Sequence, residues 1–394
     1  MKQGDVMNLP KDWEIKRLNE ICENLDNKRV PITKNVRNEG SIPYYGASGI
    51  VDYVADYLFD EDLLCVSEDG ANLLARTYPI AFSITGKTWV NNHAHVLKFK
   101  NPTTQKFVEI YLNSIKLNDF VSGMAQPKLN QTMLNKIPIP FPPLPEQKRI
   151  IGQLDESFDA ISKAKANAEQ NLKNAKELFE SYLQSVFEKK GVNWEEKTLG
   201  EIADVEYGYT DKSSEEGEYR YIRITDIDKN GELILEDKKY IKQSKEADGF
   251  IVNDNDLLMA RTGATFAKVL LYKGNEPSVF ASYLIRIKFK DKIENALYWY
   301  FTKTKYYWEQ ANSLQSGAAQ PHFNGAAVKQ VIFSYPKSVH EQKLLIEKFQ
   351  TLSGEIKKLE AIYKNKINDL DELSKIILQK AFKGELKLKI KAVL

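Results

Sequence analysis

Two long stretches of the chain carry apolar residues at alternating spacings of three and four, which is the period of a helix with one buried face. The first line runs from residue 151 and the second from residue 345, and each contains a single polar residue, Lys165 or Lys366. Two heptad-patterned helices in one chain are expected to pack on each other. The first line is Ile151, Leu154, Phe158, Ile161, Lys165, Ala168, Leu172, Ala175, Phe179, Tyr182 and Val186. The second line is Leu345, Phe349, Leu352, Ile356, Leu359, Tyr363, Lys366, Leu370, Leu373 and Ile377.

The segment before each helix has a different pattern of residues. Short β-branched and aromatic runs are broken by Gly, Asn and Asp, as in Tyr78–Val90 and Tyr219–Ile227, and these runs predict strands joined by turns. Prolines stand before the first helix and a glycine follows each helix, as expected at helix boundaries. These residues are Pro142, Pro143, Pro145, Gly191 and Gly384.

The chain also contains an internal repeat, because seven short segments recur in the same order. They are Trp13–Ile21 with Trp194–Ile202, Asp62–Leu64 with Asp256–Leu258, Gly70-Ala71 with Gly263-Ala264, Lys98–Lys100 with Lys288–Lys290, Ser122–Pro127 with Ser316–Pro321, Glu146–Lys148 with Glu341–Lys343, and Leu183-Gln184 with Leu378-Gln379. We therefore predict an α+β protein with two similar mixed α/β modules and two long helices that form an antiparallel coiled coil, with pseudo-two-fold symmetry. The predicted segments are 1–145 and 191–340 for the modules, 146–190 for the first helix, and 341–394 for the second helix with a C-terminal tail.

Composition narrows the class of protein. The formal net charge of the 394 residues is only +2, so binding to nucleic acid would have to come from locally clustered charge. Two cysteines, Cys22 and Cys65, cannot form a disulfide framework or a cysteine metal site, and we expect them to be buried small hydrophobic residues. No apolar run long enough for a membrane span and no secretory leader is present, which predicts a cytoplasmic protein without membrane contact.

The order of elements resembles a known family. A globular module, the proline-rich run Ile137–Ile150, a long helix, a second module and a second Glu-Gln-Lys helix ending in Ala381–Leu386 are similar to the specificity subunit of Type I restriction-modification systems. The resemblance implies two target recognition domains, each reading one half of a bipartite site in double-stranded DNA. It also implies helices that space the domains and dock two methyltransferase subunits. Endonuclease/translocase subunits would join through this complex, which would act as an adenine-specific DNA methyltransferase and endonuclease. The segment Ser334–His340 departs from the family pattern because it lacks the proline-rich run.

Candidate catalytic motifs are weak. Gly86-Lys87-Thr88 lacks the first glycine of a phosphate loop, and no Asn-Pro-Pro-Tyr-like methyl-transfer motif occurs. The Glu-x-Lys spacing at Glu146 and at Glu341 is used by some nucleases, but helix capping explains it better. His93 and His95 alternate on one predicted strand without a third ligand. We therefore predict no catalytic residues, no metal and no cofactor in this chain.

Polar and basic groups that can contact base edges or phosphates gather in both modules. The loop Gln126–Asn130 recurs as Gln320–Asn324 around a changed basic residue, which suggests a fixed frame with a changed contact, although a purely structural turn explains it equally well. The predicted DNA-binding residues are Lys87, Asn91, Asn92, His93, Gln126, Lys128, Arg220, Arg223, Arg261, Lys268, Gln320 and His322. Two alternatives stay open, a coiled-coil structural adaptor without base readout and a stand-alone nuclease.

Overall fold

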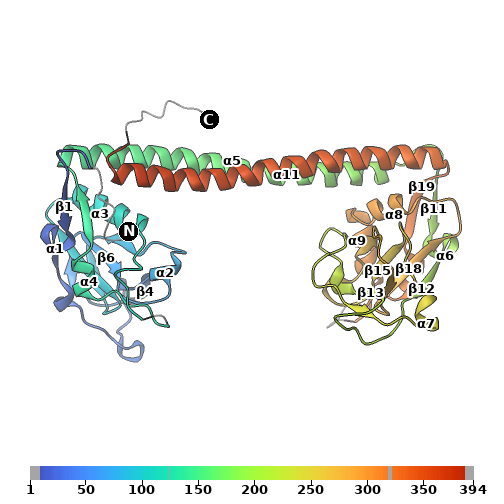
Figure 1. Ribbon diagram of the computed structural model, residues 1–394, viewed down its shortest axis with the longest axis horizontal. Coiled ribbons are helices and arrows are strands. Elements are labelled where there is room, and N and C mark those ends of the chain that lie inside the picture. The colour runs from blue at the N-terminus through green and yellow to red at the C-terminus, as the bar shows by residue number, and fades with distance from the viewer. Residues whose placement is uncertain (1–8, 124, 318–321, 387–394) are drawn as a thin grey trace. The chain divides into compact units, whose positions relative to one another are not determined.

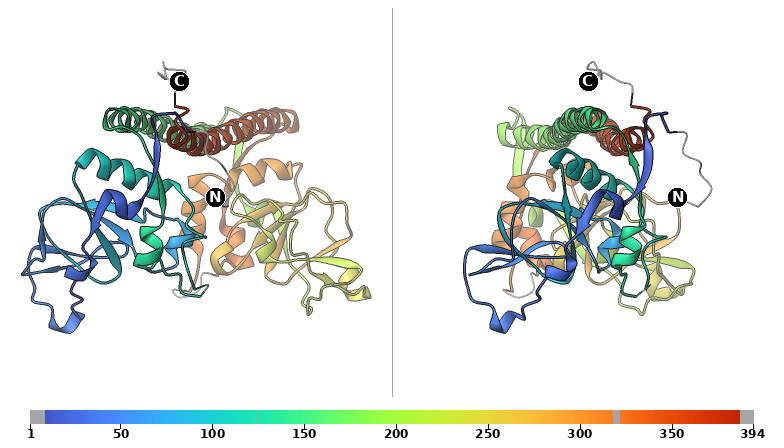
Figure 2. Two further views of the ribbon diagram at one scale, coloured as in Figure 1. Left: turned by 60° about the vertical axis from the view of Figure 1, so that its left-hand side comes forward. Right: turned by 90° about the vertical axis from the view of Figure 1, so that its left-hand side faces the viewer.

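The computed structural model describes residues 9–123, 125–317 and 322–386, and these residues form two compact units. The first unit contains residues 1–168 and 365–394, and the second contains residues 169–364. Each unit therefore combines one module with one half of each long helix. In both units the helix segments lie along one side of the module and the sheets lie beyond them (Figures 1 and 2). None of the helices in the described residues has both the length and the apolar character needed to cross a membrane.

Unit 1 holds a two-stranded ribbon and two four-stranded sheets. The ribbon pairs β1 with β10, the first sheet has the antiparallel order β2-β9-β6-β7, and the second has the order β4-β3-β8-β5. The strands are β1 (Glu14–Arg17), β2 (Cys22–Asn24), β3 (Ile42–Gly46), β4 (Gly49–Val54), β5 (Phe59–Asp60), β6 (Leu63–Ser67), β7 (Ala81–Ile84), β8 (Lys87–Val90), β9 (Ala94–Phe99) and β10 (Pro138–Phe141). The helices of this module are α1 (Leu18–Ile21), η1 (Asp26–Lys28), η2 (Lys34–Val36), α2 (Asn72–Ala75), α3 (Pro102–Ser114) and α4 (Gln131–Asn135).

Unit 2 repeats the ribbon as β11-β19 and the first sheet as β12-β18-β15-β16, whereas its second sheet has three strands in the order β14-β13-β17. The strands are β11 (Trp194–Thr198), β12 (Ala203–Tyr207), β13 (Tyr219–Ile222), β14 (Tyr240–Ile241), β15 (Leu257–Ala260), β16 (Val269–Leu271), β17 (Ser278–Phe280), β18 (Leu284–Phe289) and β19 (Ile332–Pro336). The helices are α6 (Leu199–Ile202), η3 (Ile224–Asp226), α7 (Lys245–Asp248), η4 (Gly263–Thr265), α8 (Asn295–Phe301), α9 (Lys305–Leu314) and α10 (Gly325–Gln330). The predicted fold class is thus confirmed. The first sheet has the equivalent strand order in both modules, whereas the second sheets differ.

The two long helices are α5 (Leu144–Lys189) and α11 (Val339–Phe382), and they run antiparallel within each unit. In unit 1, Arg149 donates to the carbonyl oxygen of Leu386 at 3.1 Å, and Lys165 pairs with Asp371 at 2.7 Å. In unit 2, Tyr182 packs edge-on against Phe349 with ring centroids 6.0 Å apart. Residue numbers fall along α11 as they rise along α5, which is the predicted pairing direction.

The phase of the helical seam differs from the prediction in part. Leu154, Ile161, Ala168 and Ala175 of α5 are buried as predicted. On α11 the predicted residues Phe349, Ile356, Leu370 and Ile377 are also buried, and Gln342, Ile346 and Ala381, which were not predicted, join them. Lys165 has a side chain 31% exposed at the edge of the seam, and the predicted seam residues Leu359, Lys366 and Leu373 are exposed to solvent.

A buried glutamine joins each long helix to its module. Gln147 donates to the carbonyl oxygen of Pro142 at 2.8 Å and accepts from the Thr104 hydroxyl at 2.9 Å. Gln342 likewise donates to the carbonyl oxygen of Pro336 at 2.8 Å and accepts from the backbone N–H of Glu294 at 2.8 Å. The recurring Glu-Gln-Lys segment is therefore a structural joint, in which the central glutamine satisfies buried polar groups that would otherwise be costly.

The flanking glutamates of these segments also have structural partners. Glu146 forms an ion pair with Arg149 at 2.6 Å, and Glu341 accepts from the indole N–H of Trp194 at 3.3 Å. These contacts hold the first turns of the long helices, which supports the capping interpretation of the Glu-x-Lys spacing over a nuclease site.

Replacing Gln147 tests this joint. Gln147→Ala should lower the free energy of unfolding of unit 1 by about 1–3 kcal/mol, because it strands a buried carbonyl and a buried hydroxyl without partners. Urea denaturation and amide hydrogen exchange of α3 would measure the loss. The matched control is Gln170→Ala on the exposed surface of α5, which should leave stability within about 0.5 kcal/mol of the starting value. Equal stability of the two variants would contradict the role of Gln147.

Candidate DNA-reading surface

The repeated loop of unit 1 is fixed by backbone hydrogen bonds. Ser122 and Lys128 exchange backbone bonds of 2.8 and 2.9 Å, and the N–H of Leu129 donates to the carbonyl oxygen of Glu68 at 2.8 Å. The side chain of Asn130 then caps α4 by accepting from the N–H of Met133 at 3.0 Å. Gln126 and Lys128 are exposed on this loop. The frame is therefore made by the backbone, and the side chains at its surface are free to differ.

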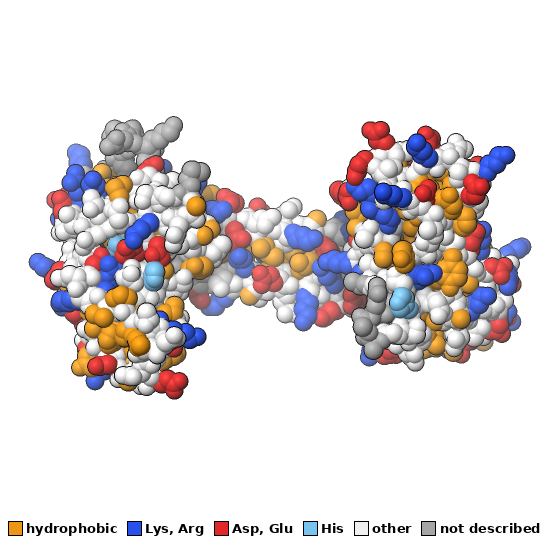
Figure 3. All heavy atoms as spheres, turned by 90° about the horizontal axis from the view of Figure 1, so that it is seen from below, with side chains coloured by type: hydrophobic (Ala, Val, Ile, Leu, Met, Phe, Trp, Pro, Cys, Tyr) orange, Lys and Arg blue, Asp and Glu red, His pale blue; other side chains and the backbone are white. Residues whose placement is uncertain are grey.

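Several predicted residues converge beside this loop. The Nδ1 atom of His93 lies 2.7 Å from Asp69, and the ammonium of Lys128 lies 3.2 Å from Glu68. Asn91 is buried and its side-chain oxygen accepts from the N–H of His93 at 2.8 Å, so it positions the turn. Asn92 is exposed on the same turn. This surface combines acidic with basic groups, and Figure 3 shows such mixed charge around a histidine in the first unit.

Lys87 lies apart from this group. It begins β8, whereas the turn with Asn91 follows the other end of the same strand. Its ammonium lies over the ring of Tyr57, 4.7 Å from the ring centroid. The structure thus brings together His93, Lys128 and their neighbours but leaves Lys87 at a separate place.

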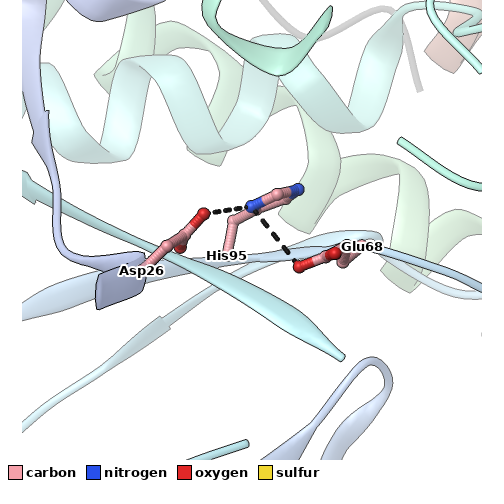
Figure 4. A group of neighbouring side chains, drawn as sticks. All are labelled: Asp26, Glu68 and His95. Carbon is pink, nitrogen blue, oxygen red and sulfur yellow. Dashed lines mark hydrogen bonds and ion pairs between the residues drawn. The ribbon is translucent and has the colours of Figure 1, made fainter. Parts of the chain in front are cut away.

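A buried ion network supports the loop from behind (Figure 4). His95 places Nδ1 2.6 Å from Asp26 and 3.8 Å from Glu68, while its Nε2 lies 2.7 Å from the carbonyl oxygen of Leu129. Each ring nitrogen of His95 thus lies within hydrogen-bond distance of an oxygen, one from a carboxylate and one from the backbone. Arg29 adds bonds of 2.7 Å to Glu68 and to the carbonyl oxygen of Ala94. The loop residue Leu129 is therefore tied to this charged cluster.

The two carboxylates of the network have shifted acidities. Burial alone would raise the pKa of Asp26, but its bond to His95, the N–H of Val96 and the nearby Arg29 bring the pKa below its usual value. Burial would likewise raise the pKa of Glu68, and Arg29, His95 and Lys128 lower it overall. Both acids are therefore held in the charged form.

Asp26, Glu68 and His95 offer ligand atoms within 4.8 Å of one another, a spacing that could suit a metal ion. The Arg29 guanidinium already bonds Glu68, and His95 uses both nitrogens, so the positive charge that the acids need is supplied by the protein. We therefore treat the cluster as an ion network. His93 and His95, which sequence placed on one strand face, take separate partners at the surface and in the interior. Sequence reasoning missed Asp26 because it lies 69 residues from His95.

Unit 2 builds the same loop frame with different side chains. His322 and Ser316 exchange backbone bonds of 2.8 and 3.0 Å, as Lys128 and Ser122 do in unit 1. The N–H of Phe323 donates to the carbonyl oxygen of Arg261 at 2.8 Å, and the N–H of Arg261 donates to that of Tyr283 at 3.1 Å. In unit 1 the corresponding bonds run from Leu129 to Glu68 and from Glu68 to His93, at 2.8 and 2.9 Å. The exposed or partly exposed positions Glu68, His93 and Lys128 thus correspond to Arg261, Tyr283 and His322.

The other predicted residues of unit 2 are dispersed. Arg220 is only 2% exposed and bonds Glu276 at 2.9 Å, so its guanidinium belongs to the interior. Arg223 is partly exposed and engages Asp226 at 2.8 Å. Lys268 lines a cavity of about 570 Å³ between the module and the helices, with other lysines including Lys303. Gln320 lies outside the described residues.

One buried lysine in this cavity is unusual. Lys303 lies over the ring of Trp299 with its ammonium 3.7 Å from the centroid, and burial lowers its pKa to about 8. The cavity also contains Glu232, which pairs with Lys357 at 2.7 Å. These contacts are distinct from the repeated loop around Arg261.

Two copies of one α+β module, each followed by a long helix and each presenting the same backbone-framed loop, define a tandem-module protein. The chain belongs to the Type I restriction modification DNA specificity domain family, whose family model matches residues 10–172 and 191–369. Membership of this family supports the role of a DNA sequence-specificity subunit. The family of specificity subunits is non-catalytic.

Individual relatives agree with this assignment. The chain is 22% identical over 415 residues to the Type I restriction enzyme MjaVIII specificity subunit of Methanocaldococcus jannaschii, covering 98% of this chain and 96% of that protein. A putative type I restriction enzyme specificity subunit of Haemophilus influenzae is 38% identical over 142 residues, which is 36% of each chain.

Solved structures share the fold. The HsdS subunit from Thermoanaerobacter tengcongensis matches with a TM-score of 0.63 and 17% identity, over 98% of this chain and 100% of that one. A chain from a study of complex assembly and conformational transition of the type I R-M system matches with a TM-score of 0.73 and 17% identity, over 96% of this chain and 99% of that one.

Acidification should weaken the ion network. Because the folded-state pKa values of Asp26 and Glu68 are lowered, the stability they contribute is complete above their unfolded values near 4 and is lost as the pH falls through the lowered values. Asp26→Asn should destabilise unit 1 at pH 7 by up to roughly 3 kcal/mol, the lower end of the cost of breaking a buried pair. The difference from the unsubstituted chain should shrink below about pH 4.

Thermal unfolding from pH 3 to pH 8 would measure this dependence. The control Asp60→Asn changes an exposed carboxylate of the same module and should leave the melting curve nearly unchanged. A constant difference between Asp26→Asn and the unsubstituted chain across that range would contradict the charged network.

Proposed function

We propose that this chain is the DNA-reading subunit of a Type I restriction-modification complex in which each module reads one half of a bipartite site. One observation carries the proposal. The two modules use the same backbone hydrogen bonds to hold the loop, yet the exposed or partly exposed groups change from Glu68, His93 and Lys128 to Arg261, Tyr283 and His322. A constant frame with changed polar groups suits two modules that read different base sequences.

The proposed reading surface is narrower than the set predicted from sequence. In unit 1 it consists of Asn92, His93, Gln126 and Lys128, with Asn91 as a positioning residue. In unit 2 it consists of Arg261 and His322, and Arg223 is proposed as a separate contact away from this loop. Arg220 is left out because its guanidinium is buried, and Lys87 and Lys268 are proposed only as phosphate contacts away from the loops.

The long helices are proposed to space the modules and to dock two methyltransferase subunits. Leu359 and Ile362 form an apolar pair on α11, and Leu373 and Ile376 form a second pair two heptads further along the same line. Each of the four is at least 39% exposed and lies outside the buried seam. Such an apolar line on the solvent-exposed face of a helix is suited to packing against helices of a partner protein. Restriction subunits would join through the complex, which would act as an adenine-specific methyltransferase and endonuclease in the cytoplasm.

A structural adaptor without base readout is the second candidate, and the same apolar line favours it. Affinity for DNA in a salt series separates the two functions. A reader should show steep salt dependence together with a sequence-dependent component, whereas an adaptor should show neither.

Module exchange tests the reading role. Replacing residues 13–145 with the first module of another family member should change one half of the recognised sequence and leave the other half intact, because each loop frame is internal to its own unit. Methylome sequencing of cells that carry the chimera with its modification subunits gives the result. A change in both halves would contradict independent reading.

Helix length tests the spacing role. Inserting one heptad into α5 and a matching heptad into α11 should lengthen the pair by about 10 Å and add near three unread base pairs between the half-sites. The heptad preserves the phase of the seam, whereas a four-residue insertion should disturb the pairing and serves as the contrasting variant. An unchanged gap in an active complex would show that the partners set the spacing.

A further inference from the structure

Arg261 occupies an unusual place in unit 2. Its guanidinium lies 5.1 Å from the ring centroid of Tyr207 and 5.7 Å from that of Tyr283. Both tyrosines are exposed, by 42% and 55%. Among the described residues the guanidinium forms no ion pair and no hydrogen bond. An arginine that lies over two rings and has no acceptor among the described residues keeps its donors available for a ligand.

The corresponding place in unit 1 is filled and neutralised. Cys22 pairs with Phe99 in unit 1, and Ala203 pairs with Phe289 at the equivalent place in unit 2. When residues are counted along the chain from these equivalent pairs, Asp26 corresponds to Tyr207 and His95 corresponds to Ile285. Glu68 corresponds to Arg261 through their matching backbone bonds. Polar groups that satisfy one another in unit 1 are thus replaced in unit 2 by an aromatic residue, an aliphatic residue and a cation that has no ion-pair partner among the described residues.

The tyrosines also hold the arginine in place. The hydroxyl of Tyr207 accepts from the N–H of Gly325 at 2.8 Å, which fixes the ring at the start of α10. The backbone of Arg261 is bonded to Tyr283 and to Phe323 on either side. A guanidinium that contacts two rings and extends from a fixed backbone has less rotational freedom to lose when it binds.

We propose that Arg261, which lies over the rings of Tyr207 and Tyr283, is a guanine-binding site that reads one base pair of the half-site recognised by unit 2. The planar fork of arginine matches the O6 and N7 acceptors that guanine presents in the major groove. A fixed plane favours this directional pairing over a phosphate contact, which a flexible lysine makes equally well. This inference rests on the proposed function, and it names the base that the second module selects.

The test uses the full chain in complex with its modification subunits. Competition binding with duplexes that carry each of the four base pairs at every half-site position would give the preference at each position. The unsubstituted complex should prefer guanine at one position of the unit 2 half-site by roughly ten- to a hundredfold. Arg261→Gln should abolish that preference and leave every other position unchanged, and Tyr283→Leu should weaken it at the same position.

Matched variants separate the outcomes. Arg261→Lys keeps the charge and should retain only part of the preference, and Lys273→Gln removes an exposed cation bonded to Asn255 and should change nothing. An equal loss of affinity for all sequences with Arg261→Gln would identify a phosphate contact and overturn the proposal. An unchanged preference would also overturn it. A complex without any sequence preference before substitution would instead refute the reading function itself.

Discussion

Phe382 lies edge-on to Phe107 and Tyr111, with ring centroids 5.3 and 5.0 Å apart, and through this contact the end of the long helix α11 completes the core of unit 1. The apolar residues of both long helices and of the module belong to one buried cluster in that unit. In unit 2, Phe187 of α5 packs edge-on against Phe301 and in a tilted arrangement against Phe349. The helices therefore serve as part of each hydrophobic core, and the loops depend on cores that the helices close.

The sequence predicted the arrangement of helices and modules well, because the patterns that indicate them are either local in the sequence or repeated along it. Heptad spacing defined both long helices, and recurring segments defined two similar modules, since identical short segments in one order are improbable without a common fold. The run Tyr78–Val90 forms β7 and β8 as expected, whereas Tyr219–Ile227 forms one strand followed by a turn of 3-10 helix. A short apolar run does not reveal where a strand stops, because the tertiary contacts decide.

The site was less predictable, for physical reasons that particular residues illustrate. Two apolar lines run along α11, and heptad spacing alone cannot tell the line that faces α5 from the exposed line with Leu359 and Leu373. Arg220 alternates with Tyr219 and Tyr221 in a strand, yet all three are buried, because Glu276, 56 residues away in the sequence, offers the arginine a partner. The network of Asp26 with His95 joins residues far apart in sequence, and no local pattern encodes such a contact.

Backbone bonding explains how two modules can share a loop and differ in chemistry. The N–H and carbonyl groups that hold Glu68 and Arg261 are the same in both units, so a change of side chain leaves the frame intact. The side chain must still find its charge partners, and in unit 1 Glu68 does so through Arg29 and Lys128. In unit 2 Tyr207 and Ile285 stand where unit 1 has Asp26 and His95, so the opposite charge of Arg261 is tolerated at a surface beside two aromatic rings. Diversity at these positions therefore requires coordinated change behind the loop, which links the reading surface to the packing beneath it.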